Sequence, residues 1–255
     1  MLRHVKAMIV KKWQGLARAV KWPPIPASAL READSIPALQ ALAAGYPFLG
    51  FNGQILRTKY LMSIFAAAGC TGFLETGTYY GGTSLLAREL FDTEVNTAEV
   101  VRKYMLHAMI RAKLARLDCI HFHFGDSRAM LDRWLCTGVG GHLPMIYLDA
   151  HWYNDLPLAD ELAIAVRQGN CLVVIDDFRV PDNDDFGYDS YHGKAIELES
   201  VAPHLPSDAW AYIPAHSASQ ETGSRRGTLI VGIGVAEPVL ADLPRSLLQR
   251  VRLSG

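Results

Sequence analysis

The strongest constraint on the fold is a repeated alternation between short apolar runs and longer segments with helical spacing. This alternation extends from Phe73 to the Asp176–Asp177 pair. Continuous apolar runs that alternate with helices are typical of parallel strands buried on both faces. Every run ends at or beside an acid. The acids at the five strand ends are Glu75, Glu99, Asp126, Asp149, Asp176 and Asp177.

The last third of the chain follows a different pattern. Residues 194–201 are predicted to form a helix, and two further apolar runs follow at 210–213 and 228–233. Because no convincing helix separates these two runs, they are expected to pair antiparallel at one edge of the sheet. The predicted fold is α/β and doubly wound, with a mostly parallel seven-stranded sheet and an antiparallel C-terminal edge hairpin.

A glycine-containing turn follows the first strand, between Glu75 and Ser84. Glycines at such a turn allow positive φ and close approach of a ligand, and the helix start beyond offers unpaired N–H groups. Glu99 lies 22 residues after Gly77, about the separation at which an acid accepts hydrogen bonds from ribose hydroxyls. The third glycine of a dinucleotide-binding turn is missing. This favours a nucleoside with an amino-acid arm, whose adenine Asp126 would contact.

Composition restricts the class of protein. The 255 residues suit one large α/β domain, and a net charge of −1 gives no reason to expect nucleic-acid binding. The four cysteines show no CxxC spacing, which favours buried reduced thiols and a cytoplasmic protein. No apolar run reaches the ~18 residues that a membrane-spanning helix needs.

Residues 1–26 form a separate predicted unit, a basic amphipathic N-terminal helical arm, and residues 27–255 form the main domain. The first 22 residues contain six Lys or Arg and no acid, with apolar residues at helical spacing. Such a helix can contact a membrane surface peripherally, form a homodimer, or pack on its own domain. Prolines at 23, 24 and 26 end the arm.

The order of these motifs resembles the class I S-adenosylmethionine-dependent methyltransferases over residues 50–235. It is most similar to the metal-dependent O-methyltransferases of the catechol, caffeoyl-CoA and macrocin types. In those enzymes an Asp after strand four and an acidic or amide pair after strand five hold a divalent cation. The resemblance therefore implies a Mg²⁺ site at Asp149, Asp176 and Asp177. Three carboxylates at neighbouring strand ends also suit this ion on chemical grounds.

The resemblance also implies which residues bind S-adenosylmethionine. The expected cofactor-binding residues lie at the ends of strands one to four, and they are Glu75, Gly77, Thr78, Tyr79, Gly81, Ser84, Glu99, Gly125, Asp126, Ser127 and Asp149. The expected partner is a small-molecule acceptor that carries a hydroxyl group.

The proton acceptor of the reaction departs from the family pattern. In the relatives a Lys or His stands three positions after the strand-four Asp, where this chain has Trp152. His151 is the predicted base beside Asp149, because the ordinary pKa of histidine suits proton transfer near neutrality. The predicted activity is methyl transfer to a hydroxyl oxygen with help from a divalent metal. A metal-dependent hydroxylase-like enzyme and an inactive cofactor-binding protein are the alternatives.

Overall fold

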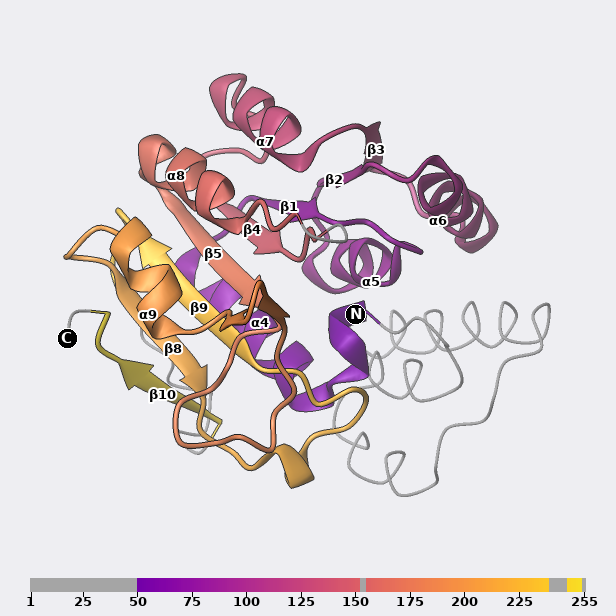
Figure 1. Cartoon of the computed structure of the whole chain (residues 1–255). Helices are drawn as coiled ribbons and strands as arrows, with labels where there is room; N and C mark the ends of the chain where they lie inside the picture. The colour runs from indigo at the N-terminus through magenta and orange to yellow at the C-terminus, as the bar shows by residue number, and fades with distance from the viewer. Residues whose placement is uncertain (1–49, 152–154, 239–246, 254–255) are drawn as a thin grey trace.

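The structure, a computed structural model, describes residues 50–151, 155–238 and 247–253. The predicted arm at 1–26, the domain boundary after it and Trp152 lie outside these residues. The described chain forms an eight-stranded sheet with helices on both faces (Figure 1). The strand order is β10-β8-β9-β5-β4-β1-β2-β3. The predicted doubly wound α/β fold is confirmed.

Five consecutive strands form the parallel half of the sheet. Their bounds are β1 (Gly72–Thr76), β2 (Val95–Glu99), β3 (Ile120–Phe124), β4 (Pro144–Leu148) and β5 (Cys171–Asp176). The neighbours in this half pair in parallel, so their carboxyl ends meet at one edge. That edge is where open α/β sheets bind ligands.

The remaining strands of this sheet are antiparallel to their neighbours. β9 (Thr228–Ile233) pairs with β5 and with β8 (Trp210–Pro214), as the sequence predicted for an edge hairpin. β10 (Leu248–Val251) then pairs with β8 and extends the sheet. The predicted count of seven strands was one too low, because β10 is too short and too polar to stand out in the sequence.

The six α-helices of the described residues include one in each connection between the parallel strands, as the alternation predicts. Their bounds are α4 (Ile55–Ala68), α5 (Gly82–Phe91), α6 (Arg102–Ala115), α7 (Ser127–Cys136), α8 (Leu158–Gln168) and α9 (Leu198–Val201). Three short 3₁₀ helices, η2 (Gly50–Gly53), η3 (Ala202–His204) and η4 (Ala218–Gln220), complete the described set. The predicted helix at 194–201 begins only at Leu198. Its first residues form β7 (Lys194–Ala195), which pairs with β6 (Ser190–Tyr191).

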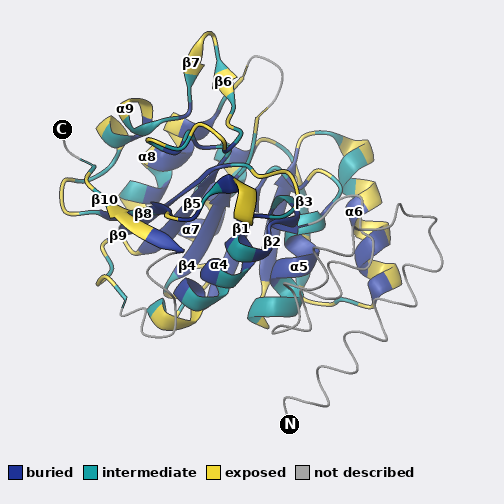
Figure 2. Ribbon diagram, turned by 90° about the horizontal axis from the view of Figure 1, so that it is seen from below, coloured by how far each residue is buried: buried dark blue, intermediate teal, exposed yellow. Residues whose placement is uncertain are grey.

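Two hydrophobic clusters cover the two faces of the sheet. Alternate residues of each strand point to opposite sides, so Phe73 and Leu74 belong to different clusters. One cluster includes α7 and α8, and the other includes α4 and α5. Figure 2 shows the strands buried between these layers. The sheet interior therefore has no exposed face between β5 and β2.

The thiols only partly match the sequence prediction. All four cysteines are free, and Cys171 is buried, but Cys119 and Cys136 are exposed. The expectation of buried thiols was therefore wrong for these two. Among the described residues, none of the helices is long and apolar enough to cross a membrane.

Gly77, at the end of β1, provides a test of how tightly the strand ends pack. Its φ is +86°, and a Cβ there would lie 2.4 Å from the carbonyl oxygen of Asp149. Gly138 has a similar φ of +72° with no atom near its missing Cβ. We expect Gly138→Ala to lower the free energy of unfolding by about 1 kcal/mol, and Gly77→Ala by at least about 2 kcal/mol more. Urea denaturation of both variants measures this difference. Equal losses would show that the β1 and β4 ends are not closely packed.

Candidate active site

A cleft lies at the carboxyl ends of β1, β2 and β4. Its larger lobe has a volume of about 540 Å³. The lobe is lined by most of the predicted site residues, namely Gly77, Tyr79, Glu99, Gly125, Asp126, Ser127, Asp149, His151 and Asp177. A smaller lobe of about 280 Å³ adds Glu75 and Thr78. Both lobes share Gly77, Tyr79 and Asp149, so they form one continuous site.

The turn after β1 is fixed to β2 by hydrogen bonds. The backbone N–H groups of Gly77 and Thr78 donate to the carbonyl oxygen of Ala98, each at 3.0 Å. Gly81 adopts a φ of +77° and caps α5, and its N–H donates to the carbonyl of Thr78. Gly81 and Ser84 therefore help to fix the conformation of the turn, but they line neither lobe of the cleft.

Glu99 and Asp126, the predicted ribose and adenine contacts, both accept backbone hydrogen bonds. Glu99 accepts from the N–H of Tyr79 at 2.7 Å and from the N–H of Val101 at 2.8 Å. Asp126 caps α7 by accepting from the N–H of Arg128, whose side chain it also pairs with at 2.6 Å. Both carboxylates also line the cleft, so these hydrogen bonds hold them in position there.

Glu75 is a buried carboxyl at the floor of the smaller lobe. The hydroxyls of Ser84 and Thr97 donate to its Oε2 atom, the latter at 2.5 Å. Burial raises the pKa of Glu75 to about 8, despite the opposing effect of these two donors, and the charge of Glu99 adds to the rise. These surroundings therefore favour the protonated form of Glu75.

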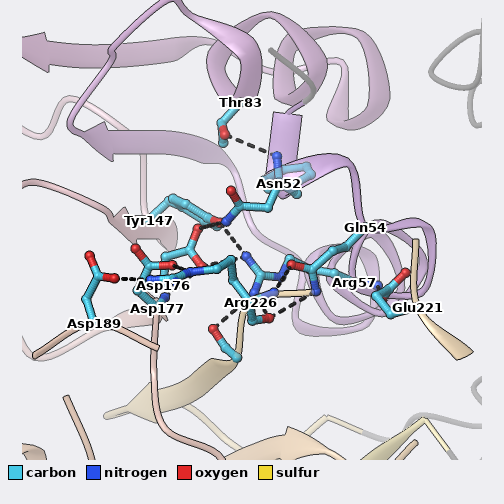
Figure 3. A network of polar contacts seen from close by, with 12 residues as sticks. Asn52, Gln54, Arg57, Thr83, Tyr147, Asp176, Asp177, Asp189, Glu221 and Arg226 are labelled. Atoms are coloured by element: carbon cyan, nitrogen blue, oxygen red, sulfur yellow. Dashed lines mark hydrogen bonds and ion pairs between the residues drawn. The ribbon is translucent and has the colours of Figure 1, made fainter. Parts of the chain in front are cut away.

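Asp176 faces the protein interior. Its carboxylate accepts from Arg57 Nη1 at 2.6 Å, from the Tyr147 hydroxyl at 2.5 Å and from Asn52 Nδ2 at 2.8 Å (Figure 3). The side chains of Arg57 and Asp176 are almost fully buried. The Arg57 guanidinium therefore neutralises Asp176, and both oxygens of the carboxylate already accept hydrogen bonds.

Asp177 is the neighbouring carboxylate, and it lines the cleft. Arg226 bridges it to Asp189, with Nε close to Asp177 and Nη2 close to Asp189 (Figure 3). Burial and the adjacent charge of Asp176 raise the pKa of Asp177 to about 6, while Arg226 opposes the rise. A backbone φ of +54° turns Asp177 away from the direction of β5.

Asp149 has no such cation at hydrogen-bonding distance among the described residues. Burial raises its pKa well above the ordinary range, and the charges of Asp176 and Asp177 raise it further. Ligand atoms of Asp149, His151 and Asp177 lie within 4.8 Å of one another, so they form a potential metal-binding group. Of the three predicted metal ligands, the structure thus brings Asp149 and Asp177 together with His151, and it places Asp176 outside this group.

Two site residues, Arg57 and Arg226, had no role in the sequence prediction, whereas Asn52 stands in a segment that the resemblance placed before the cofactor site. Arg57 is an arginine in the apolar helix α4, and this unusual position was the available signal. Arg226 belongs to a hairpin loop and cannot be paired with Asp177 from sequence alone. Asn52 lines both lobes with a φ of +60°, a conformation that Asn adopts more readily than most residues.

Comparison with solved structures identifies the fold. An O-methyltransferase from Bacillus cereus, solved in complex with SAH, superposes over 88% of this chain and 99% of its own, with a TM-score of 0.50 and 17% identity. A Klebsiella pneumoniae protein to which O-methyltransferase activity is ascribed matches over 86% and 94% of the two chains, with the same score and identity. The chain has the Rossmann-like methyltransferase fold.

This methyltransferase fold confirms the architecture that the strand-end motifs predicted. No protein-family profile matches the sequence, and no curated protein matches it significantly. The likeness is therefore one of three-dimensional fold.

The contribution of the buried ion pair between Arg57 and Asp176 to stability can be tested by mutation. Arg57→Met leaves the Asp176 carboxylate buried without its cation, so we expect a loss of about 3–5 kcal/mol in the free energy of unfolding. The double variant Arg57→Met/Asp176→Asn removes both charges and should lose less than the sum of the single variants, by about 2 kcal/mol or more. Chemical denaturation of the full cycle measures this coupling. Additive losses would contradict a buried ion pair.

Proposed function

We propose that this chain is an S-adenosylmethionine-dependent methyltransferase that transfers a methyl group to a hydroxyl oxygen of a small molecule. The observation that carries the proposal is a cleft at the strand ends whose central carboxyls, Asp149 and Glu75, have no cationic partner among the described residues. A positively charged ligand would compensate these acids. S-adenosylmethionine brings both an ammonium and a sulfonium group.

The two lobes of the cleft suggest how the cofactor would lie. The smaller lobe, with Glu75 and Thr78, would hold the amino-acid end. The larger lobe would hold the nucleoside, with Glu99 at the ribose hydroxyls and Asp126 at the adenine. Asp149 lines both lobes, so it would lie near the sulfonium between them.

The reaction needs a nucleophile and a proton acceptor. The hydroxyl oxygen of the small molecule that receives the methyl group attacks the methyl carbon. The carbon–sulfur bond breaks, and the electron pair of that bond stays on sulfur. The hydroxyl proton passes to a base, and His151 at the cleft is the residue proposed for this step. Its Nε2 atom lies 3.9 Å from Asp189 Oδ2, so that carboxylate would help to orient the ring.

A divalent cation also fits this site. Mg²⁺ is commonly held by one or two carboxylates together with waters, and Asp149 and Asp177 would supply these carboxylates. When bound, the ion lowers the pKa of a coordinated hydroxyl. Asp176 is not part of this proposal, because Arg57, Tyr147 and Asn52 occupy its oxygens.

Cofactor binding tests the proposal. We expect calorimetry to detect S-adenosylmethionine binding, with an affinity that rises from pH 6 to pH 8. The sign follows from the raised pKa values, because the cationic ligand binds the ionised acids and Asp149 and Glu75 must release protons first. The demethylated product lacks the sulfonium charge and should show a weaker pH dependence. Asp149→Asn should weaken S-adenosylmethionine binding by about tenfold or more.

The matched control for this experiment is Asp132→Asn. Asp132 is a surface residue of α7 that pairs with Arg167, so its loss changes the net charge equally and leaves the cleft unchanged. Absence of binding by the wild-type protein would overturn the methyltransferase proposal. Equal weakening by both variants would show that net charge, rather than Asp149, controls the affinity.

The contact between Arg226 and Asp177 leads to a separate prediction about metal affinity. The Arg226 guanidinium already pairs with Asp177, so it competes with any divalent ion for that carboxylate. We expect Arg226→Met to raise the affinity for Mn²⁺ by about tenfold or more, measured by electron paramagnetic resonance without substrate or cofactor. The neighbouring Arg225→Met is the control, because the exposed Arg225 side chain donates to the carbonyl of Glu221 instead. If neither the wild type nor Arg226→Met binds Mn²⁺, the metal part of the proposal fails.

A further inference from the structure

The outer face of α6 has an unusual distribution of apolar residues. The residues of α6 that are buried against the domain include Ala108, Ala112 and Ala115, whereas four of its large apolar residues are exposed. Leu106, Ile110 and Leu114 recur at every fourth position, and their exposed fractions are 44%, 59% and 58%. Residues at this spacing lie on one side of a helix. The helix therefore presents an apolar stripe on its outer side, where Figure 2 shows exposed residues of α6.

Positive charges flank this stripe. The exposed cationic residues of the helix and its C-cap are Arg102, Lys103, Lys113 and Arg116. No acid occurs from residue 102 to residue 117. A helix that combines an exposed apolar stripe with cations and no acid along its length has the pattern of helices that lie in the interface of an anionic bilayer.

The N-terminal part of α6 adjoins the cleft, because Tyr104 lines the larger lobe. Val100 lies directly after β2 and two residues before α6, and it lines the larger lobe. Its side chain is 42% exposed, and that of Phe124, at the end of the edge strand β3, is 55% exposed. Phe124 directly precedes the cleft residues Gly125 and Asp126. A surface that contacted α6 would thus also lie beside the cleft entrance.

We propose that this face of α6, with Val100 and Phe124, docks the protein on the surface of an anionic lipid bilayer. Leu106, Ile110 and Leu114 would enter the boundary between headgroups and acyl chains. Arg102, Lys103 and Lys113 would contact anionic headgroups. The cleft entrance would then face the lipid surface. This inference is independent of the reaction proposed above.

Charge favours lipid over the two other occupants that the chain itself offers. A second copy joined symmetrically through α6 would bring two cationic helices together with no acid on either one. The segment of residues 1–22 has six Lys or Arg and no acid, so its docking on α6 would also bring like charges together. An anionic surface complements the charge of both segments.

Vesicle sedimentation of the full chain without cofactor tests the proposal. We expect binding to vesicles of phosphatidylcholine mixed with phosphatidylglycerol, weaker binding at high salt, and little binding to phosphatidylcholine alone. Leu106→Glu/Ile110→Glu should lower the partition coefficient for the mixed vesicles by about tenfold or more. Ala163→Glu/Gln249→Glu is the control, because it adds the same charge at exposed positions on α8 and on the opposite edge strand β10. This control should bind nearly as the wild type does.

Three results would overturn the proposal. One is failure of the wild type to bind the mixed vesicles. Another is equal binding by Leu106→Glu/Ile110→Glu, which would assign the contact to another part of the chain. The third is a wild-type dimer, measured by light scattering, that becomes monomeric in this variant, which would identify a second copy as the occupant. Thermal melts of both double variants verify that the fold is retained.

Discussion

The buried ion pair between Arg57 and Asp176 is the interaction on which the rest of the site depends. A buried charge is strongly unfavourable unless it is paired and hydrogen-bonded. Asp176 meets this requirement with Arg57, Tyr147 and Asn52, and Arg57 also donates to the carbonyl of Gly227 at 3.0 Å. These contacts join η2, α4, β4, β5 and the start of β9 at one point. The carboxyl end of the sheet therefore has a fixed shape before any ligand binds.

The same pair determines which acids remain for chemistry. Of the acids behind and within the cleft, Arg57 neutralises Asp176, and Arg226 shares its one positive charge between Asp177 and Asp189. Asp149 and Glu75 have no comparable partner, and the pKa of each is raised. A site with this imbalance favours cations, and it favours them most where its two lobes meet at Asp149. Position at a strand end alone did not distinguish these two groups of acids.

Much of the fold was predictable because strand and helix periods are local properties of the sequence. The five parallel strands, the acids at their ends and the cleft location all followed from such local patterns. The pairing of Arg226 with Asp177 was not predictable, because a hairpin loop carries no local signal for its distant contacts. For the same reason, the sequence could not show that Asp176 would turn toward Arg57, 119 positions earlier. The short strand β10 was missed because its assignment depends on pairing with β8.

The start of α4 is held by residues near the other end of the sheet domain. Glu221 accepts from the backbone N–H groups of Leu56 and Arg57, each at 3.0 Å, and Thr222 accepts from that of Ile55 at 3.0 Å. During synthesis on the ribosome, α4 is the first α-helix of the described residues to be made, and it can form these contacts only after one of the last loops has been made. The domain cannot complete its folding strand by strand from its N-terminal side. Its first buried charge stays unprotected until most of the chain has been translated.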